Sequence, residues 1–336
     1  MKAIVYRQCL PIDNPAALED AEIPEPTPAP RDLLVRVTAI AVNPVDTKMR
    51  RYAPPVAGQA KVLGWDAVGI VEGVGAQVSQ FKVGDRVYYA GAIDRPGANA
   101  ELHTVDERIV ALAPRSLDDA QAAALPLTTL TAYELLFDRF GVAKGGGSGQ
   151  SLLVVGGAGG VGSILIQLAR QLTQLKVIAT ASRPETRQWC LDLGAHAVID
   201  HSQPLSEALK AGGHSLVDLA AVLTHAPAHF EQLIASLKPQ GKLGSIDDLN
   251  GVNPTALREK SISLHQELMY TRSLFQTDDM GEQGKLLAEV AALIDAGHIR
   301  STANAHYGTI NAANLRKAHA LQESGKAQGK TVLVGF

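Results

Sequence analysis

The sequence predicts an α/β protein that combines a β-rich part with a doubly wound parallel sheet. Between residues 151 and 246, short apolar runs alternate with segments of helical periodicity, which is typical of a parallel sheet with helices on both faces. Before residue 116, short strand patterns are separated by glycine and proline, which indicates a small barrel or sandwich. The two sequence patterns predict two structural parts.

Composition narrows the class of protein. The 336 residues are 46% hydrophobic with a net charge of −3 and no Lys/Arg cluster, so we expect neither a nucleic-acid partner nor an anionic membrane surface. No apolar run reaches the length of about 18 residues that a membrane span needs. The two cysteines, Cys9 and Cys190, lie far apart, which argues against a disulfide framework and against a four-cysteine zinc site. We expect a cytoplasmic protein.

The β-rich part begins with a strand at 2–6 and a proline-rich connector from residue 23 to 30. An alternating pattern predicts a mainly antiparallel strand at 32–42, and one or two helical turns follow Asn43-Pro44. Glycine-punctuated strands fill 68–87, and one or two more lie in 98–110. Two helices are expected next, one opened by Ser116 as N-cap and running through Leu125, the other from about 127 to 140.

The alternating part predicts a regular order of elements. Strands are expected at 151–156, 176–181, 196–200, 215–221 and 241–246, with helices near 160–173, 184–193, 204–211 and 226–237. Beyond them we expect a strand at 261–269, helices at 277–296 and 311–322, and a final strand at 331–334.

The stretch SLLVVGGAGGVGS, residues 151–163, indicates a dinucleotide site. A buried strand runs into the spacing G-x-G-x-x-G at Gly157, Gly159 and Gly162, and a helix follows directly. Such glycines permit a tight turn, close approach of a pyrophosphate and close helix–strand packing. The helix start offers free N–H groups to a phosphate. The alternative is a flexible glycine-rich turn, but the flanking strand and helix favour the dinucleotide.

The end of the second parallel strand predicts which dinucleotide binds. An NAD site places a carboxylate there, whereas this chain has Thr180-Ala181-Ser182-Arg183. A hydroxyl and a guanidinium suit a 2′-phosphate, so we predict NADPH. Glu185 is the nearest acid; we interpret it as the end of a Ser182-x-x-Glu185 capping box rather than as a ribose ligand. A solvated Arg183 is the alternative.

Several motifs together resemble the medium-chain dehydrogenase/reductase superfamily, and within it the zinc-independent quinone oxidoreductase branch. They are AGGVGS after the apolar strand, LPLTTLTAYELL some way before it, FKVGDRV and NPVD. The resemblance covers nearly the whole chain. It implies a GroES-like catalytic domain from residues 1–126 and 271–336, around an inserted Rossmann domain for NADP at 127–270.

The resemblance also implies that the metal is absent. Zinc-dependent members carry Cys at the position of Asn43 and Gly-His-Glu at the position of Gly64-Trp65-Asp66. Asp46, Asp66 and His103 offer no replacement, because nothing in their spacing brings them together. We interpret His103 as a strand histidine with a satisfied ring nitrogen. We predict no metal ligands.

The resemblance and the polar character of NPVD suggest the site residues. Asn43, Asp46 and Tyr52 are the predicted catalytic residues, although Asp46 suits an N-cap equally well and Tyr52 suits a loop tyrosine. Trp65, Asp66 and Thr128 are expected to shape the substrate pocket. The predicted cofactor contacts are Thr131, Gly157, Gly159, Gly160, Val161, Gly162, Thr180, Ser182, Arg183, Ser245, Ile246 and Lys330.

The predicted function is reduction of a quinone or α,β-unsaturated carbonyl by direct hydride transfer from NADPH, because such acceptors spread the arriving charge over their own π-system. One alternative is a zinc-dependent alcohol dehydrogenase with unusual ligands, and another is an NADPH-binding sensor or interaction protein with little turnover. In the resembling family, the strand at 261–269 pairs across a dimer, so we predict a homodimer.

Overall fold

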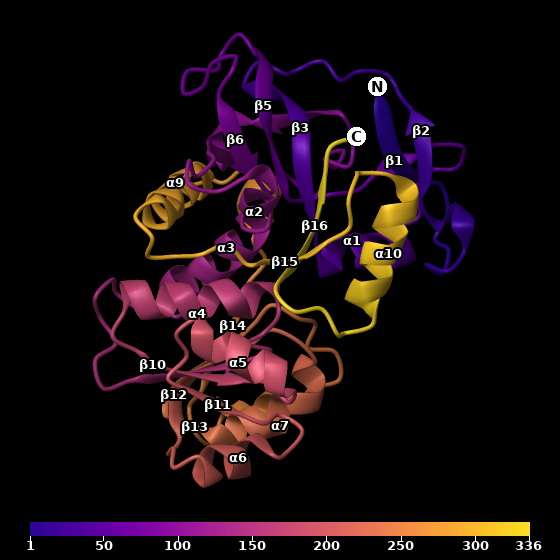
Figure 1. The fold of residues 1–336 in the computed structure, drawn as a ribbon. Coiled ribbons are helices and arrows are strands. Elements are labelled where there is room, and N and C mark those ends of the chain that lie inside the picture. The colour runs from indigo at the N-terminus through magenta and orange to yellow at the C-terminus, as the bar shows by residue number, and fades with distance from the viewer. The chain divides into compact units, whose positions relative to one another are not determined.

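The structure, a computed structural model, describes residues 1–336 and consists of two compact units (Figure 1). Unit 1 contains residues 1–130 and 270–336, and unit 2 contains residues 131–269. The predicted divisions fell after residues 126 and 270. The combination of a β-rich, GroES-like unit with a parallel-sheet Rossmann unit confirms the predicted fold class.

Unit 1 is built around a seven-stranded sheet that combines strands from residues 32–112 with the two C-terminal strands. Its strands follow the order β15-β16-β3-β5-β6-β8, with β7 paired to β3. A second sheet has the order β2-β1-β4. The strands are β1 (Lys2–Tyr6), β2 (Glu19–Glu22), β3 (Asp32–Val42), β4 (Lys61–Val62), β5 (Ala67–Val74), β6 (Arg86–Tyr89), β7 (Leu102–Asp106), β8 (Val110–Leu112), β15 (Ala303–His306) and β16 (Lys330–Val334).

The pairing of β16 with β3 decides what the C-terminal strand brings to this unit. The two strands are antiparallel, with Thr331 opposite Val42 and Val332 opposite Ala41, and Figure 1 shows yellow β16 beside β3. This register carries Lys330 to the end of β3, beside Asn43. The helices of the unit are α1 (Pro44–Tyr52), α2 (Asp119–Ala123), α3 (Pro126–Tyr133, whose last turn belongs to unit 2), α8 (Thr271–Leu274), α9 (Glu282–Asp295) and α10 (Ala312–Glu323).

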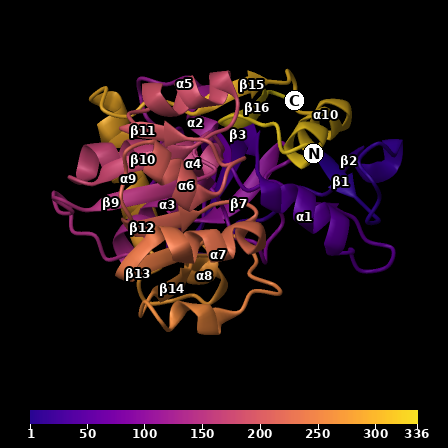
Figure 2. The same ribbon diagram turned by 90° about the horizontal axis from the view of Figure 1, so that it is seen from below.

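Unit 2 is a six-stranded sheet in which every pair is parallel. Figure 2 shows its strands in the order β11-β10-β9-β12-β13-β14. They are β9 (Ser151–Val155), β10 (Lys176–Thr180), β11 (Ala197–Ile199), β12 (Val217–Val222), β13 (Leu237–Ser245) and β14 (Ser263–Gln266). The helices are α4 (Gly160–Leu172), α5 (Pro184–Asp192), α6 (Leu205–Ala211) and α7 (Ala226–Ser236), with a π-helical segment at Glu134–Arg139.

The core of unit 2 explains why its strands are apolar throughout. Leu153 and Val155 face a cluster formed with α6 and α7, which includes Leu209 and Phe230. Leu152 and Val154, on the other face, are also fully buried. Both faces are therefore covered, as a parallel sheet requires. Parallel strands end at one common edge, so Val155, Thr180, Ile199, Val222 and Ser245 bring the loops that follow them to the same side of the sheet.

Two local predictions need correction. The helix expected from Ser116 begins at Asp119 with Asp118 as N-cap, because the Asp118 carboxylate accepts from the Gln121 N–H whereas Ser116 bonds to Asp295. The strand expected at 261–269 is shorter, Ser263–Gln266, and lies at the sheet edge. Its pairing in a homodimer stays a prediction, testable by light scattering. None of the helices has the length and apolar content that a membrane crossing requires.

Candidate active site

A group of buried polar residues lies where β3 ends and α1 begins. Asn43 is the N-cap of α1, and the Pro that follows it occupies the first helical position, where a missing N–H costs nothing. Asp46, three residues on, accepts the Asn43 N–H at Oδ2 over 2.7 Å. Both residues are at most 1% exposed. The carboxylate therefore ties the first turn of the helix back to its cap.

Lys330 places a cation against these groups. Its ammonium donates to the Val42 carbonyl over 2.9 Å, to Asp66 Oδ2 over 2.8 Å, and to Asn43 Oδ1. Asp66 also accepts from the Asn43 side-chain amide at 2.8 Å and, through Oδ1, from the Leu127 N–H at 2.7 Å. We call Asn43, Asp46, Asp66 and Lys330 the Lys330 corner.

Burial dominates the electrostatics of the Lys330 corner. It raises the pKa of Asp46 to about 7, against the opposing effects of the Asn43 N–H and the Lys330 charge. Burial also raises the pKa of Asp66, again against Lys330. Asp46 Oδ1 is buried and has no hydrogen-bond partner. One acceptor of the corner is thus left for a group from outside the chain or for the carboxyl's own proton.

Two aromatic residues lie beside the Lys330 corner. Trp65 is fully buried, donates its indole N–H to the Ala92 carbonyl over 3.1 Å, and meets the Tyr270 ring edge-on at 6.2 Å between centroids. The Tyr270 hydroxyl is buried without a hydrogen-bond partner. Burial and the charges of Asp46 and Asp66 raise the pKa of Tyr270 well above its usual value. Tyr270 is therefore a neutral, unused donor close to Asp46.

The other residues predicted for the substrate end differ in environment. Tyr52, at the end of α1, is 68% exposed, and the Arg51 guanidinium lies over its ring at 4.9 Å. Thr128 is buried in α3 and donates to the Leu125 carbonyl over 3.1 Å. A substrate contact of either residue stays a prediction.

The glycine turn of unit 2 has the predicted architecture. Gly159 is the N-cap of α4, so the first N–H groups of that helix belong to Gly160, Val161 and Gly162. A Cβ on Gly162 would lie 2.4 Å from the Gly156 carbonyl oxygen, whereas one on Gly159 would meet only that oxygen, at 3.5 Å. Gly162 is required by packing within the chain. The space at Gly159 is not needed for packing, which fits a phosphate group approaching the helix start.

The end of β10 corrects one prediction. Ser182 and Glu185 form no capping box, because α5 begins at Pro184 and its N-cap is Arg183. Proline favours the first helical position, which puts Glu185 at the second position rather than the third that a capping box uses. Glu185 instead pairs with the Arg183 Nε at 2.9 Å. Ser182 is exposed, and its contact with a 2′-phosphate stays a prediction.

Thr180 supports the glycine turn from the neighbouring strand. Its hydroxyl accepts the Gly156 N–H at 3.1 Å and contacts His201 Nδ1 at 3.1 Å. At the end of β13, the buried Ser245 hydroxyl bonds to the Asp247 backbone, and Ile246 follows it at the same edge. Thr131 lies in the last turn of α3 and is buried. The cofactor contacts predicted for these residues remain predictions, and so does that of Lys330, whose ammonium has three acceptors within unit 1.

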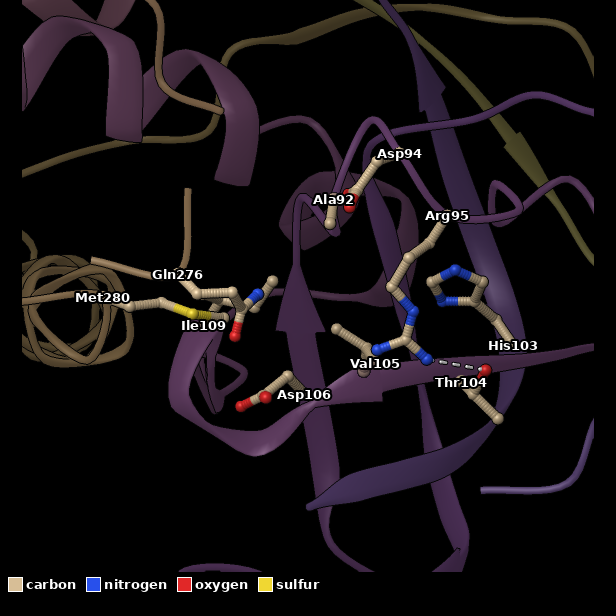
Figure 3. Close-up of a pocket in the computed structure, with 10 residues that line it drawn as sticks. All are labelled: Ala92, Asp94, Arg95, His103, Thr104, Val105, Asp106, Ile109, Gln276 and Met280. Atoms are coloured by element: carbon tan, nitrogen blue, oxygen red, sulfur yellow. Dashed lines mark hydrogen bonds between the residues drawn. The ribbon is translucent and has the colours of Figure 1, made fainter. Parts of the chain in front are cut away.

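A small cavity in unit 1 is too small for a substrate. Its volume is about 30 Å³, which suits a single water molecule. Figure 3 shows Arg95 beside it, bonded to Thr104; the guanidinium also makes two bonds to Asp32. Both nitrogens of His103 have partners, the Tyr89 hydroxyl at 3.1 Å and the Pro96 carbonyl at 2.9 Å, as expected for a strand histidine.

Comparisons with known proteins agree with this architecture. Residues 29–115 match the family model of the alcohol dehydrogenase GroES-like domain, and residues 193–333 match that of zinc-binding dehydrogenases. A zinc-type alcohol dehydrogenase-like protein of Staphylococcus epidermidis is 38% identical over 336 residues, 99% of each chain. The chain belongs to the medium-chain dehydrogenase/reductase superfamily. It is an oxidoreductase.

Other relatives within the superfamily have different names. The 2-methylene-furan-3-one reductase of Solanum lycopersicum is 32% identical over 90% of this chain and 71% of its own. Among solved structures, a Rhizobium etli protein described as a candidate zinc-dependent alcohol dehydrogenase has a TM-score of 0.96 and 51% identity, covering 100% of this chain and 98% of its own. Escherichia coli quinone oxidoreductase complexed with NADPH has a TM-score of 0.83 and 27% identity, covering 99% and 100%.

The Lys330 corner does not suit the zinc ion of zinc-dependent superfamily members. An amide and an indole stand at the positions of two ligands, and the Trp65 nitrogen is a donor with no lone pair for a metal. Both oxygens of Asp66 already accept hydrogen bonds. The structure has no group of three or more His, Cys, Asp or Glu side chains arranged to hold a metal ion.

Sequence reasoning missed two features of this superfamily member. Tyr270 stands outside every motif, one residue beyond the predicted strand at 261–269. The sequence predicts Lys330 as a cofactor contact, whereas its place beside Asn43 depends on the pairing between β3 and β16. A repeated apolar pattern at 331–334 predicted the strand and gave no sign of its partner.

Proposed function

We propose that this oxidoreductase reduces quinones or α,β-unsaturated carbonyl compounds with NADPH and without a metal ion. The observation that carries the proposal is a pair of buried groups without hydrogen-bond partners, Asp46 Oδ1 within the Lys330 corner and the Tyr270 hydroxyl beside it. Buried polar atoms are rarely left without partners. A donor and a carboxyl oxygen together suit the oxygen end of a conjugated acceptor.

The cofactor part of the proposal is supported by unit 2. The N-terminus of α4 with the open space at Gly159 would hold the pyrophosphate, and Ser182 and Arg183 would bind the 2′-phosphate. No carboxylate stands at the end of β10, where NAD enzymes hold the ribose. The superfamily relative from E. coli is complexed with NADPH. When bound, NADPH supplies a hydride to the acceptor.

The residues of unit 1 would then stabilise the negative charge on the acceptor and supply the proton that the reduction consumes. As a hydride arrives at the acceptor, negative charge collects on its oxygen, and a hydrogen bond from Tyr270 becomes stronger in the transition state than before it. The reduction also consumes one proton. Asp46, with a pKa near 7, is suited to supply it at neutral pH. Asp46 then regains its proton from water.

The metal-free part of the proposal is supported by Lys330. In zinc-dependent members of the superfamily, a metal cation stabilises an alkoxide as a Lewis acid. Here an ammonium takes up the acceptor atoms of Asn43 and Asp66 and itself provides the positive charge of the corner. A conjugated acceptor needs no Lewis acid of that strength, because its own π-system spreads the charge.

The test follows NADPH oxidation with a panel of quinones, enals and enones, with simple alcohols and NADP as a separate arm. The decisive variant is Tyr270→Phe, which removes only the unpartnered hydroxyl. We expect kcat/KM to fall by about 10²-fold, as for loss of one donor to a developing oxyanion. Tyr52→Phe is the matched control. Comparing the two variants shows which hydroxyl, that of Tyr52 or that of Tyr270, donates to the acceptor oxygen.

Each outcome of this test has one meaning. Turnover of conjugated acceptors that depends on Tyr270 supports the proposal, and dependence on Tyr52 would transfer the donor role to Tyr52. Alcohol oxidation that a chelator abolishes would contradict the metal-free reaction and indicate a zinc-dependent alcohol dehydrogenase. Tight NADPH binding with no turnover of any acceptor would indicate a sensor or interaction protein.

A further inference from the structure

Three histidines gather at the carboxyl edge of the sheet in unit 2. His201 follows β11, His225 follows β12, and His229 lies in the first turn of α7. Because the strands are parallel, these loops reach the same edge as the glycine turn. The rings of His201 and His229 meet edge to face, with centroids 6.5 Å apart. His225 is close enough for its charge to lower the pKa of both other rings.

The cluster is connected to the cofactor turn through one hydroxyl. Thr180 lies between Gly156 N and His201 Nδ1, at 3.1 Å from each. Since Thr180 accepts from Gly156, its single proton is available for a neutral His201. His229 Nδ1 is buried and has no hydrogen-bond partner, and the His225 Nδ1 contacts the Thr224 hydroxyl at 2.8 Å.

The charges around the three rings are mixed. Asp200, next to His201, acts to raise the pKa of that ring, and its own pKa is held low mainly by the Ser202 N–H. Arg187, on α5, also acts on Asp200. Asp247, after β13, lies 3.4 Å from the Ala226 N–H at the start of α7. Burial lowers the pKa of both His201 and His229, and the neighbouring rings of the cluster lower it further.

We propose that His201, His225 and His229 form a proton-dependent subsite for the phosphate monoester at the adenosine end of the cofactor. The site rests on the proposed function, since it takes the 2′-phosphate as ligand. A dianionic phosphate beside the rings favours their charged form, so binding takes up protons.

This subsite complements Arg183 rather than replacing it. The Arg183 guanidinium keeps its charge at every accessible pH and is paired with Glu185 in the absence of ligand. Arg183 accounts for a preference for NADPH that does not vary with pH. The histidines add a contribution to the preference for NADPH over NADH that grows as the pH falls. The ratio of the dissociation constants of NADH and NADPH therefore measures both parts.

The experiment measures this ratio between pH 8 and pH 6 with the full chain, without any acceptor. In the native protein we expect the ratio to rise about tenfold towards pH 6, which corresponds to a shift of one pKa unit on binding. In the triple variant His201→Asn, His225→Asn, His229→Asn, the ratio should stay flat. The cofactor's own phosphate titrates with a pKa near 6 in both proteins, so this effect cancels in the comparison. His214→Asn, beside Lys176 at the opposite end of β10, is the control.

A second measurement needs no variant. Calorimetry of NADPH binding at pH 7 in two buffers of different ionisation enthalpy gives the number of protons taken up, which we expect to be positive for NADPH and near zero for NADH. A ratio that does not vary with pH, or equal uptake with both cofactors, would overturn the subsite. If NADPH still reduces conjugated acceptors in that case, the proposed function stands. If NADH binds as well as NADPH at every pH, the cofactor assignment itself fails.

Discussion

The Lys330 corner and the glycine turn differ in the groups that they contain. In the corner, Asp66 and Lys330 are ionisable side chains at most 3% exposed, with almost every polar atom bonded inside the chain. The glycine turn carries no charge; it offers backbone N–H groups and space at the start of α4. Changes in the corner should therefore affect folding as well as chemistry, whereas a change at the open position of the turn, Gly159, should affect ligand affinity at constant stability.

The largest expected effect is a loss of folding stability when the Lys330 corner is changed. Lys330→Met removes the cation and leaves Asp66 buried without its partner, which typically costs about 3–5 kcal/mol. The free energy of unfolding in urea measures this loss. Lys326→Met, at an exposed position four residues earlier, should change it by less than about 0.5 kcal/mol. An unchanged stability of Lys330→Met would show that the pair is not formed.

The glycine turn offers a matched pair of substitutions. Gly162→Ala places a methyl 2.4 Å from the Gly156 carbonyl oxygen, so it should lower both stability and cofactor affinity. Gly159→Ala fits the free protein and should leave the melting temperature nearly unchanged while raising the NADPH dissociation constant about tenfold or more. If Gly159→Ala binds NADPH normally, the pyrophosphate does not approach this position.

The Lys330 corner should also give stability a distinct pH dependence. The pKa of Asp46 is about 7 in the folded protein and near 3.8 in the unfolded chain, so the folded state holds the proton more tightly. The stabilisation is complete below pH 3.8 and is lost as the pH rises to about 7. Asp46→Asn removes this titration. The stability of the native protein relative to this variant should therefore decrease from pH 4 to pH 7 in urea unfolding, and a constant difference would contradict the raised pKa.

The smallest expected effect concerns the ion pair at the cofactor edge. Arg183→Ala should reduce the preference for NADPH over NADH about tenfold, the loss of one charge-assisted contact. Glu185→Ala releases Arg183 from its partner and should strengthen NADPH binding by a few fold. Stability should not change, because both side chains are more than one third exposed. Weaker NADPH binding by Glu185→Ala would show that the acid itself holds the ribose.

The two regions also differ in how well the sequence predicted them. The turn from Gly157 to Gly162 and its strand–helix setting are local, so a run of thirteen residues sufficed. The corner depends on the register between β3 and β16, which brings Lys330 to Asn43 from the other end of the chain. Periodicity predicts strands but carries no information on such pairing. At Arg183, the preference of Pro184 for the first helical position overrode the capping motif.

The metal content of the active enzyme tests the central claim most directly. The protein is dialysed against EDTA, its zinc is quantified, and its rate of NADPH oxidation with an enal is compared before and after. If Lys330 takes the place of a metal cation, the dialysed protein contains far less than one zinc per chain and keeps its full rate. Stoichiometric zinc, with a rate that falls on chelation and returns with added Zn²⁺, would contradict the account.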